Sequence, residues 1–227
     1  MIKAVLCDLD GTLLDSNALH ATAWKQAFEH FGFKFTFDAV LHQIGKGGDQ
    51  LIPTFLSKGD RDKFEKPIEE FRKNLFHSEY FDKIKPFPEV RELVEIMRAC
   101  GLRIAIASSS EKQDLQKLEA IAQISDLVEK ETSSDDAEAS KPAPDIFQAA
   151  LNRLQLSASD CLALGDTPWD VKAAERTGVK TVALTCGGWR AEELKEAGAI
   201  EVYRDPAELK KCFNTSAFFV TRPKHVI

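Results

Sequence analysis

The sequence predicts an α/β fold, a doubly wound and mostly parallel sheet into which an all-helical cap is inserted. After residue 84, short apolar runs alternate with amphipathic segments, as in strands joined by helical crossovers. Between residues 17 and 83 the pattern is helical, and no convincing strand interrupts it. Because one apolar run precedes this insert, we expect a discontinuous core, 1–16 and 84–227, and a cap, 17–83.

The first strand is the apolar run that starts at Ile2, and it ends in two carboxylates, Asp8 and Asp10. Gly11 then turns the chain away. Two unpaired carboxylates at the end of a buried strand are costly unless a cation or a bound phosphate uses them. Ligands of open α/β sheets bind beyond the carboxyl ends of the strands, so we expect a site here.

The insert contains two predicted helical stretches. The first, 17–31, has apolar residues at spacings of three and four and is closed by Gly32. A glycine-rich turn at 44–49 follows, and 50–80 is helical with a break at 57–60. The two prolines within 83–88 indicate a linker back to the core.

Beyond this linker, the predicted helices and strands alternate. The expected helices are 89–100, 111–122, 145–154, 171–177 and 191–197, and the expected strands are 102–107, 127–129, 161–164, 179–184 and 201–203. The last stretch, 214–227, is compatible with an edge segment, a cover for a partner surface or disorder, and the sequence does not choose among them.

Composition excludes several classes of protein. The 227 residues are 44% hydrophobic and 29% charged, as in an ordinary globular protein, and the net charge of −6 gives no case for nucleic-acid binding. No apolar run approaches the roughly 18 residues of a membrane span, and the N-terminus has no signal-peptide pattern. The five cysteines are far apart and form no CxxC pair, so we expect a cytoplasmic protein without a zinc site or disulfides.

Polar side chains in four loops of the α/β part are expected to meet at one edge of the sheet. They are Asp8 with Asp10, Ser108, Lys141, and Asp166 with Asp170. Such a set suits phosphoryl transfer, in which a carboxylate can act as the nucleophile. The acidic groups and phosphate oxygens suit Mg²⁺, and Lys141 would act as a point charge on the phosphate.

These loops resemble the four motifs of the haloacid dehalogenase superfamily of phosphatases and phosphomutases. Residues 8–13 (DLDGTL) match the first motif, Ser108 the second, 141–145 (KPAPD) the third and 165–170 (GDTPWD) the fourth. The helical insert fits the family's first type of cap. The resemblance spans the whole predicted core in the right order.

The resemblance implies a role for each residue. Asp8 attacks phosphorus, and Asp10 protonates the leaving oxygen and later deprotonates water, so its pKa should lie near the operating pH. Mg²⁺ is bound by the Asp8 side chain, the Asp10 backbone carbonyl and Asp166, and Asp170 supports or ligates it. Phosphoryl oxygens are held by Ser108 and Lys141, with help from Thr12 and the amides near Leu9 and Ser109.

An acid two residues after the nucleophile favours phosphate-ester chemistry over the family's dehalogenases. We therefore expect a phosphatase acting on a small phosphorylated metabolite such as a sugar phosphate or phosphoglycolate. His20 and Trp24 resemble the start of the β-phosphoglucomutase cap, but the loop around Lys46 lacks the arginine of such mutases.

A mutase, a non-catalytic scaffold and a signalling phosphoacceptor therefore stay as alternatives, and the oligomeric state is open. His20 either packs the hinge or touches substrate, Trp24 belongs to the cap interior or forms a binding platform, and Lys46 lies in a plain turn or contacts substrate.

Overall fold

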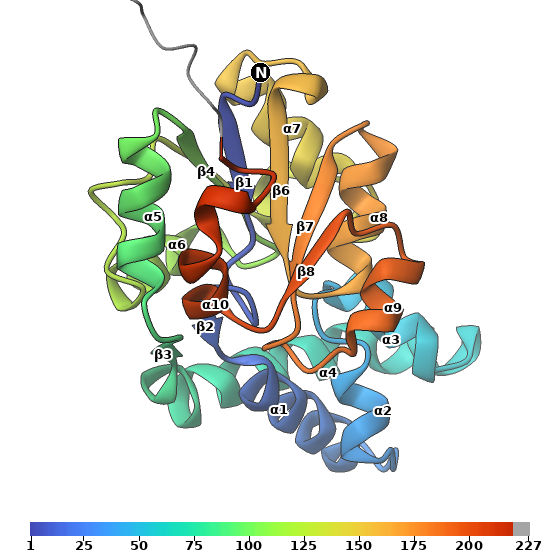
Figure 1. Ribbon diagram of the computed structural model, residues 1–227. Helices are drawn as coiled ribbons and strands as arrows, with labels where there is room; N and C mark the ends of the chain where they lie inside the picture. The colour runs from blue at the N-terminus through green and yellow to red at the C-terminus, as the bar shows by residue number, and fades with distance from the viewer. Residues whose placement is uncertain (220–227) are drawn as a thin grey trace, which may run out of the picture.

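The computed structural model describes residues 1–219, and a six-stranded parallel sheet forms the centre of its larger part (Figure 1). The strand order is β5-β4-β1-β6-β7-β8. The strands are β1 (Ala4–Cys7), β4 (Arg103–Ala107), β5 (Lys130–Thr132), β6 (Cys161–Gly165), β7 (Lys180–Leu184) and β8 (Glu201–Tyr203). Because β1 pairs with both β4 and β6, the N-terminal strand lies in the middle of the sheet.

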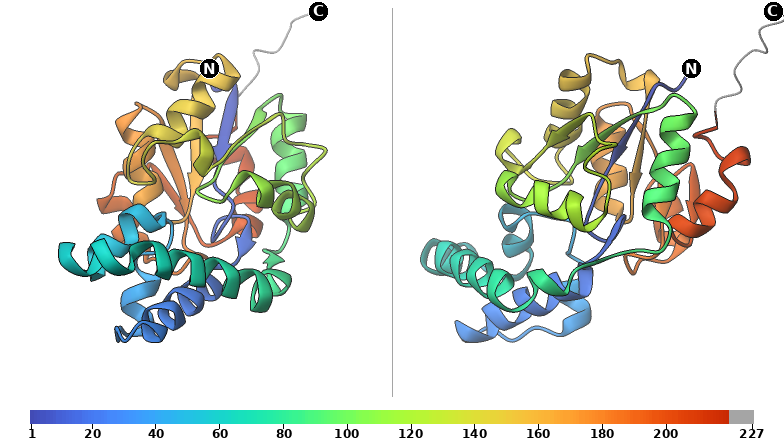
Figure 2. Two further views of the ribbon diagram at one scale, coloured as in Figure 1. Left: turned by 180° about the vertical axis from the view of Figure 1, so that it is seen from behind. Right: turned by 90° about the vertical axis from the view of Figure 1, so that its left-hand side faces the viewer.

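Helices cover both faces of this sheet, which confirms the predicted doubly wound α/β class (Figure 2). Val5 and Cys7 of β1 belong to one apolar cluster, whereas Ala4 and Leu6 belong to another, because successive side chains of a strand point to opposite faces. The first cluster includes α5 (Val90–Ala99), α6 (Lys112–Ile121) and α10 (Pro206–Lys211), and the second includes α7 (Asp145–Leu154) and α8 (Pro168–Arg176). A further helix, α9 (Ala191–Glu196), packs against α8 and β8.

The helical insert lies beyond the carboxyl ends of the strands (Figure 1). It consists of α1 (Asn17–His30), α2 (Phe37–Leu41), α3 (Gly48–Phe55) and α4 (Lys58–Glu79). Most of its buried apolar residues form a cluster of their own, in which Trp24 and Phe28 of α1 are one turn apart, whereas Ala23 and Phe76 belong to the first cluster on the sheet. The insert therefore has an apolar interior of its own and also packs on the sheet edge where the predicted site lies.

The two crossings between the sheet and the helical insert pair with each other. Strand β2 (Leu14–Asp15) is antiparallel to β3 (Lys85–Pro86), with Leu14 opposite Pro86 and Asp15 opposite Lys85. The chain thus leaves for the insert and returns from it at adjacent points. The division into 1–16 with 84–227 and 17–83 stays a prediction.

Some elements differ from the sequence-based prediction. The short helices α2 and α10 were not expected, and β5 lies at Lys130–Thr132 rather than at 127–129. The apolar Leu127 and Val128 suggested the strand, but these residues pack against the first apolar cluster, while the polar residues after them pair with β4. Four short 3₁₀ turns complete the described chain: Phe81–Lys83, Ser134–Asp136, Ala158–Asp160 and Phe213–Thr215.

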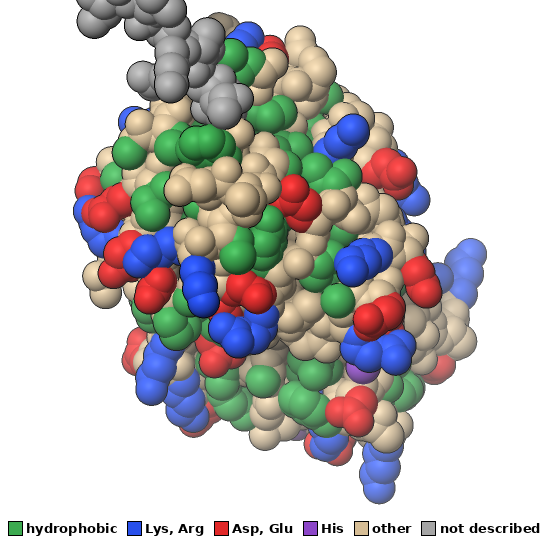
Figure 3. Space-filling view, viewed as in Figure 1, with side chains coloured by type: hydrophobic (Ala, Val, Ile, Leu, Met, Phe, Trp, Pro, Cys, Tyr) green, Lys and Arg blue, Asp and Glu red, His purple; other side chains and the backbone are tan. Residues whose placement is uncertain are grey.

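The C-terminal stretch 214–227 is described up to residue 219, and residues 220–227 lie outside the described part. Phe218 is fully buried in the first apolar cluster, so this part of the stretch packs on the core. Among residues 1–219, no helix is both long and apolar enough to cross a membrane. Acidic and basic side chains are interspersed on the face in Figure 3.

Candidate active site

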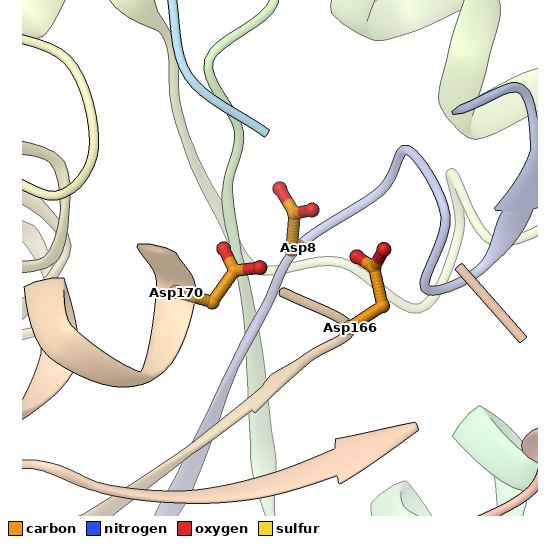
Figure 4. A group of neighbouring side chains, drawn as sticks. All are labelled: Asp8, Asp166 and Asp170. Carbon is orange, nitrogen blue, oxygen red and sulfur yellow. The ribbon is translucent and has the colours of Figure 1, made fainter. Parts of the chain in front are cut away.

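Three buried carboxylates meet where the central strands end (Figure 4). Asp8 follows β1, Asp166 follows β6, and Asp170 lies in the first turn of α8. One carboxylate oxygen from each lies within 4.8 Å of the others. Because β1 and β6 are neighbouring parallel strands, their carboxyl ends bring Asp8 and Asp166 together, as the sequence predicts.

Lys141 is the cation that contacts this cluster. Its Nζ lies 2.7 Å from Asp8 Oδ1 and 2.7 Å from Asp170 Oδ1, and its side chain is 1% exposed. Burial alone lowers the pKa of a lysine, but the carboxylates of Asp170 and Asp8 hold the pKa of Lys141 above its usual range. Lys141 is therefore a fixed ammonium that neutralises part of the acidic cluster.

Asp170 is held by the start of its own helix. Thr167 and Asp170 form a reciprocal cap, in which the Thr167 hydroxyl donates to Asp170 Oδ2 at 2.6 Å and the Thr167 amide donates to the same oxygen at 3.0 Å. One oxygen of Asp170 is thus used to cap the N-terminus of α8, and the other points toward Lys141.

Asp166 lies in a close-fitting cradle. Thr12 Oγ1 donates to Asp166 Oδ1 and Asn17 Nδ2 donates to Asp166 Oδ2, both at 2.8 Å. A Cβ atom at Gly187 would stand 1.7 Å from Asp166 Oδ2, and one at Gly11, whose φ is +78°, would stand 2.2 Å from the same oxygen. Only glycine allows the backbone to approach this carboxylate so closely at both positions.

The electrostatics of the cluster suit a divalent cation. Burial, followed by the neighbouring charges of Asp170 and Asp8, raises the pKa of Asp166 well above its usual range. Burial likewise raises the pKa of Asp8 to about 7, although Lys141 opposes the shift. Three carboxylates facing one ammonium leave an excess of negative charge on hard oxygen donors, which is the donor set that divalent ions such as Mg²⁺ prefer. The cluster can therefore hold a divalent metal.

Asp10 points away from this cluster, toward the helical insert. Its Oδ1 accepts hydrogen bonds from Ser16 Oγ at 2.6 Å and His20 Nε2 at 3.1 Å, and its Oδ2 accepts from Ser110 Oγ at 2.9 Å. Burial raises the pKa of Asp10, but His20 and the two hydroxyls outweigh it and hold that pKa well below its usual range. This differs from the expected pKa near the operating pH, because three donors stabilise the ionised carboxylate.

His20 bridges Asp10 and an arginine that the sequence analysis did not single out. Arg72 Nη2 lies 2.5 Å from His20 Nδ1. Because a guanidinium only donates, Nδ1 must accept, so the ring is neutral and its Nε2–H donates to Asp10. Burial, opposed by Asp10, lowers the pKa of His20, in agreement with a neutral ring. The ring also stacks on Phe76 with centroids 4.1 Å apart.

A cavity of about 700 Å³ extends from Asp8 and Asp10 to the helical insert. The three cap residues singled out from sequence all line it: His20, Trp24 and Lys46. Trp24 also belongs to the apolar cluster of the insert and is 5% exposed. Lys46 Nζ donates to Gln43 Oε1 at 2.6 Å and lies 4.0 Å from the Trp169 ring centre, so it joins the insert to α8.

The serine run after β4 occupies the cavity wall. Ser109 and Ser110 line the cavity. Ser108 is buried, and its Oγ accepts from the Ser110 amide at 3.1 Å, which leaves its own hydroxyl proton available. Of the predicted phosphate-binding residues, Thr12 is engaged with Asp166, whereas the Ser108 and Ser109 hydroxyls donate to no partner among residues 1–219.

Polar contacts join the helical insert to the loop that precedes Lys141. The Gly47 amide donates to Ser140 Oγ at 2.8 Å, and the Ser140 amide donates to Asp49 Oδ2 at 3.1 Å. The Ser140 hydroxyl also donates to Asp49 Oδ1. On the far side of the cavity, Lys73 of α4 pairs with Glu111 beside α6. The insert is therefore docked onto the sheet edge on both sides of the cavity.

Several residues of the site were missed in the sequence. Ser16 and Asn17 lie three and four residues after the first motif, and Ser110 ends the serine run, so nearness to the motifs was the available signal. Arg72 lies four residues from each of the buried Ile68 and Phe76, so it interrupts the buried face of α4. A cation at such a position signals a buried role, but the sequence does not show what it faces.

Residues 5–184 match the model of the haloacid dehalogenase-like hydrolases, which is more than half of the chain. The chain therefore belongs to this family. The matched segment contains the complete carboxylate cluster and Lys141.

The particular relatives place the chain in the phosphatase branch of the family, as predicted. It is 31% identical over 215 residues to pyrophosphatase PpaX of Bacillus mycoides, covering 92% of this chain and 93% of the relative. It is 29% identical over 188 residues to phosphoglycolate phosphatase of Aquifex aeolicus, covering 82% and 86%.

Solved structures support the same fold. A hydrolase from Pseudomonas syringae superposes with a TM-score of 0.81 at 27% identity, over 94% of this chain and 98% of the other. β-Phosphoglucomutase from Clostridium difficile superposes with a TM-score of 0.82 over 96% and 97%, and at 20% identity this likeness concerns the fold alone. The family match and the named relatives together make the chain an enzyme of the phosphatase branch.

Proposed function

We propose that this protein is an Mg²⁺-dependent phosphatase that hydrolyses a small phosphate monoester through an aspartyl-phosphate on Asp8. The observation that carries the proposal is the position of Asp8, beyond the central strand, against Lys141 and beside two further carboxylates. A carboxylate in this position can act as a nucleophile toward a phosphorus atom whose negative oxygens are offset by fixed positive charge.

In the first step, one oxygen of Asp8 attacks phosphorus and the bond from phosphorus to the leaving oxygen breaks. Lys141 binds Asp8 Oδ1, which fixes the rotation of the carboxylate and leaves the other oxygen to form the new bond. Lys141, the Ser108 hydroxyl and the donors around Ser109 would hold the phosphoryl oxygens. The phosphate contact expected from Thr12 stays a prediction, and its hydroxyl supports Asp166 here.

Asp10 would handle the protons. It donates a proton to the leaving oxygen, and in the second step it takes one from the water that attacks the aspartyl-phosphate, which releases phosphate and restores Asp8. The three donors around Asp10 favour its ionised form, which suits the water-activating step. For the first step, we expect the substrate to enter with Asp10 protonated and to displace one of these donors.

Mg²⁺ would be held by Asp8, Asp166, Asp170 and the backbone carbonyl of Asp10. When bound, it would neutralise charge on the phosphoryl oxygens and on the carboxylate cluster. Asn17 and Thr12 keep Asp166 oriented for this task by occupying one lone pair on each of its oxygens.

The test is hydrolysis of p-nitrophenyl phosphate with Mg²⁺ and with EDTA, for the wild type and for Asp8→Asn. We expect EDTA to abolish turnover and Asp8→Asn to lower kcat by at least about a thousandfold, because the nucleophile is lost. Asp15→Asn is the matched control, since Asp15 is an exposed carboxylate in β2. Equal activity of the wild type and Asp8→Asn would exclude Asp8 as the nucleophile.

A second substrate separates the phosphatase from a mutase. With β-glucose 1-phosphate and a bisphosphate primer, a phosphatase releases inorganic phosphate, because water is the acceptor of the phosphoryl group. Accumulation of glucose 6-phosphate instead would overturn the proposal.

A further inference from the structure

Arg72 is a buried cation at the active-site cavity. It lies on α4, and its guanidinium carbon is 4.9 Å from the Phe76 ring centre and 5.2 Å from that of Trp24. Its Nη2 donates to the neutral His20 ring, whereas its Nε is buried without a hydrogen-bond partner. The guanidinium is thus fixed in position by aromatic rings while part of its donor capacity is unused.

No carboxylate of residues 1–219 lies within ion-pair distance of Arg72. The acidic groups around it are engaged by other side chains: Asp10 accepts a hydrogen bond from the neutral His20 ring at 3.1 Å, Glu111 pairs with Lys73 at 2.6 Å, and Asp114 contacts His77 at 3.2 Å. Glu69, one turn earlier on α4, forms no ion pair within the described part of the chain, and burial raises the pKa of its carboxyl group.

Removing a charge from water without a partner is unfavourable. Burial lowers the pKa of Arg72 to about 10, which still leaves it cationic at neutral pH. Its planar fork matches the two oxygens of a carboxylate or a phosphate. An anion that enters the cavity would therefore supply the partner that Arg72 lacks.

The place of Arg72 in the site decides which part of the substrate it meets. In the proposed mechanism Asp10 faces the leaving oxygen, and His20 separates Asp10 from Arg72. Lys141, by contrast, contacts Asp8 and Asp170 on the side of the transferred phosphoryl group. Arg72 therefore lies beside the leaving group and not beside the phosphoryl group that Asp8 receives.

We infer that Arg72 binds an anionic group on the leaving part of the substrate and thereby selects this class of substrate. The inference rests on the proposed phosphatase function. It names phosphate compounds whose leaving part carries a carboxylate or a second phosphate, and it disfavours neutral sugar and alkyl esters. The relatives named above for phosphoglycolate and pyrophosphate are named for substrates of this class.

The test compares two substrates that differ in one group, 2-phosphoglycolate and 2-hydroxyethyl phosphate. The leaving part of the first ends in a carboxylate, and that of the second ends in an uncharged hydroxyl. For the wild type we expect kcat/KM to be at least about tenfold higher for phosphoglycolate, as a desolvated charge pair supplies such a factor.

In Arg72→Gln the ratio of kcat/KM for phosphoglycolate to kcat/KM for 2-hydroxyethyl phosphate should fall to about one, mainly through a higher KM for phosphoglycolate. Arg72→Lys should retain part of this preference. Pyrophosphate is the third substrate. Arg72→Gln should lower kcat/KM for pyrophosphate by a larger factor than it lowers kcat/KM for 2-hydroxyethyl phosphate. Lys73→Gln is the matched control, because the adjacent Lys73 is already paired with Glu111, and it should keep the wild-type ratio.

Arg72 also contacts His20, so replacing Arg72 can lower the rate of hydrolysis of every substrate. If Arg72→Gln lowers kcat/KM by the same factor for phosphoglycolate and 2-hydroxyethyl phosphate, Arg72 only positions His20. That result would overturn the inference. A wild-type ratio of one would overturn it too. Absence of hydrolysis of p-nitrophenyl phosphate by the wild type with Mg²⁺ would instead contradict the proposed function itself, so the two failures are distinguishable.

Discussion

The two walls of the active-site cavity are built in different ways. On the sheet side, Lys141 lies 2.7 Å from both Asp8 and Asp170, and all three side chains are buried. On the side of the helical insert, Arg72 contacts a neutral imidazole and aromatic rings, and Lys46 contacts an amide and an indole. The Lys141 ammonium is thus paired with carboxylates on one wall, whereas on the other Arg72 and Lys46 have no carboxylate within ion-pair distance among residues 1–219.

This difference shows how the molecule separates its tasks. Parallel strands fix the sheet wall, so its carboxylates hold the same positions for every substrate. The other wall belongs to helices with a separate apolar cluster. Reaction chemistry is expected from the first wall and choice of substrate from the second.

The largest effect is expected for Lys141→Met, which removes the paired cation of the sheet wall. Two carboxylates would then be buried without it, which should lower the free energy of unfolding by about 3–5 kcal/mol. Turnover of p-nitrophenyl phosphate should fall at least about a thousandfold, because Lys141 holds both Asp8 and the phosphoryl oxygens. Urea unfolding and initial rates, both without and with Mg²⁺, measure the two effects.

Lys73→Met removes a cation from the opposite wall and is the control for this comparison. The Lys73 side chain is 43% exposed, and its pair with Glu111 should contribute below about 1 kcal/mol. If both substitutions destabilise the protein equally, the difference between the two walls does not hold.

An intermediate effect is expected at Glu119, a carboxylate that is 6% exposed on α6 and has no cation within ion-pair distance among residues 1–219. Burial, followed by the charge of Glu131, raises its pKa to about 7 from the ordinary 4.5. The folded protein then binds a proton more tightly than the unfolded chain. This group's contribution to stability is therefore greatest below pH 4.5 and is lost as the pH rises through about 7.

Glu119→Gln should remove this pH dependence and be more stable than the wild type at pH 8 by about 1–3 kcal/mol. Urea unfolding of both proteins between pH 5 and 8 measures the difference, which should shrink toward pH 5. A constant difference across this range would show that burial without a paired cation is not costly here, and it would weaken the contrast with Asp8 and Lys141.

The smallest effect is expected for Asp49→Ala, which removes one of the contacts between the two walls. Asp49 accepts from both the amide and the hydroxyl of Ser140, the residue before Lys141. Losing these bonds should lower kcat/KM by about three- to tenfold, because each hydrogen bond contributes about 0.5–1.5 kcal/mol. Steady-state kinetics measure this loss, which should be absent in Asp60→Ala, whose carboxylate bonds to Ser57 within the helical insert. An unchanged kcat/KM in Asp49→Ala would mean that this contact does not align the two walls.

The same contrast explains what could be predicted from the sequence. Asp8 and Asp166 were placed correctly at neighbouring strand ends, because parallel strands bring such ends to one edge. Lys141 was also placed correctly there, although only the structure shows that it bridges Asp8 and Asp170. The register of β5 was missed, because apolar Leu127 and Val128 pack beside the sheet rather than within it.

The insert was less predictable in its details. Its helical character was clear from spacing, but the direction in which α4 presents Arg72 depends on how α4 packs against α1, which spacing does not specify. Similarly, the three donors to Asp10 come from α1, from the residue before it and from the loop after β4. Only the folded chain brings them to one carboxylate, and with it the low pKa of Asp10.

The pairing of β2 with β3 has a consequence for how such a protein can be altered. Leu14 lies opposite Pro86 and Asp15 opposite Lys85, so the stretch between them starts and ends at one place on the sheet domain. A stretch with adjoining ends can be exchanged as a cassette without moving the strands on either side. A cap grafted between Asp15 and Lys85 from a relative would bring a different substrate wall to the same Asp8, so new specificities can arise by recombination as well as by point mutation.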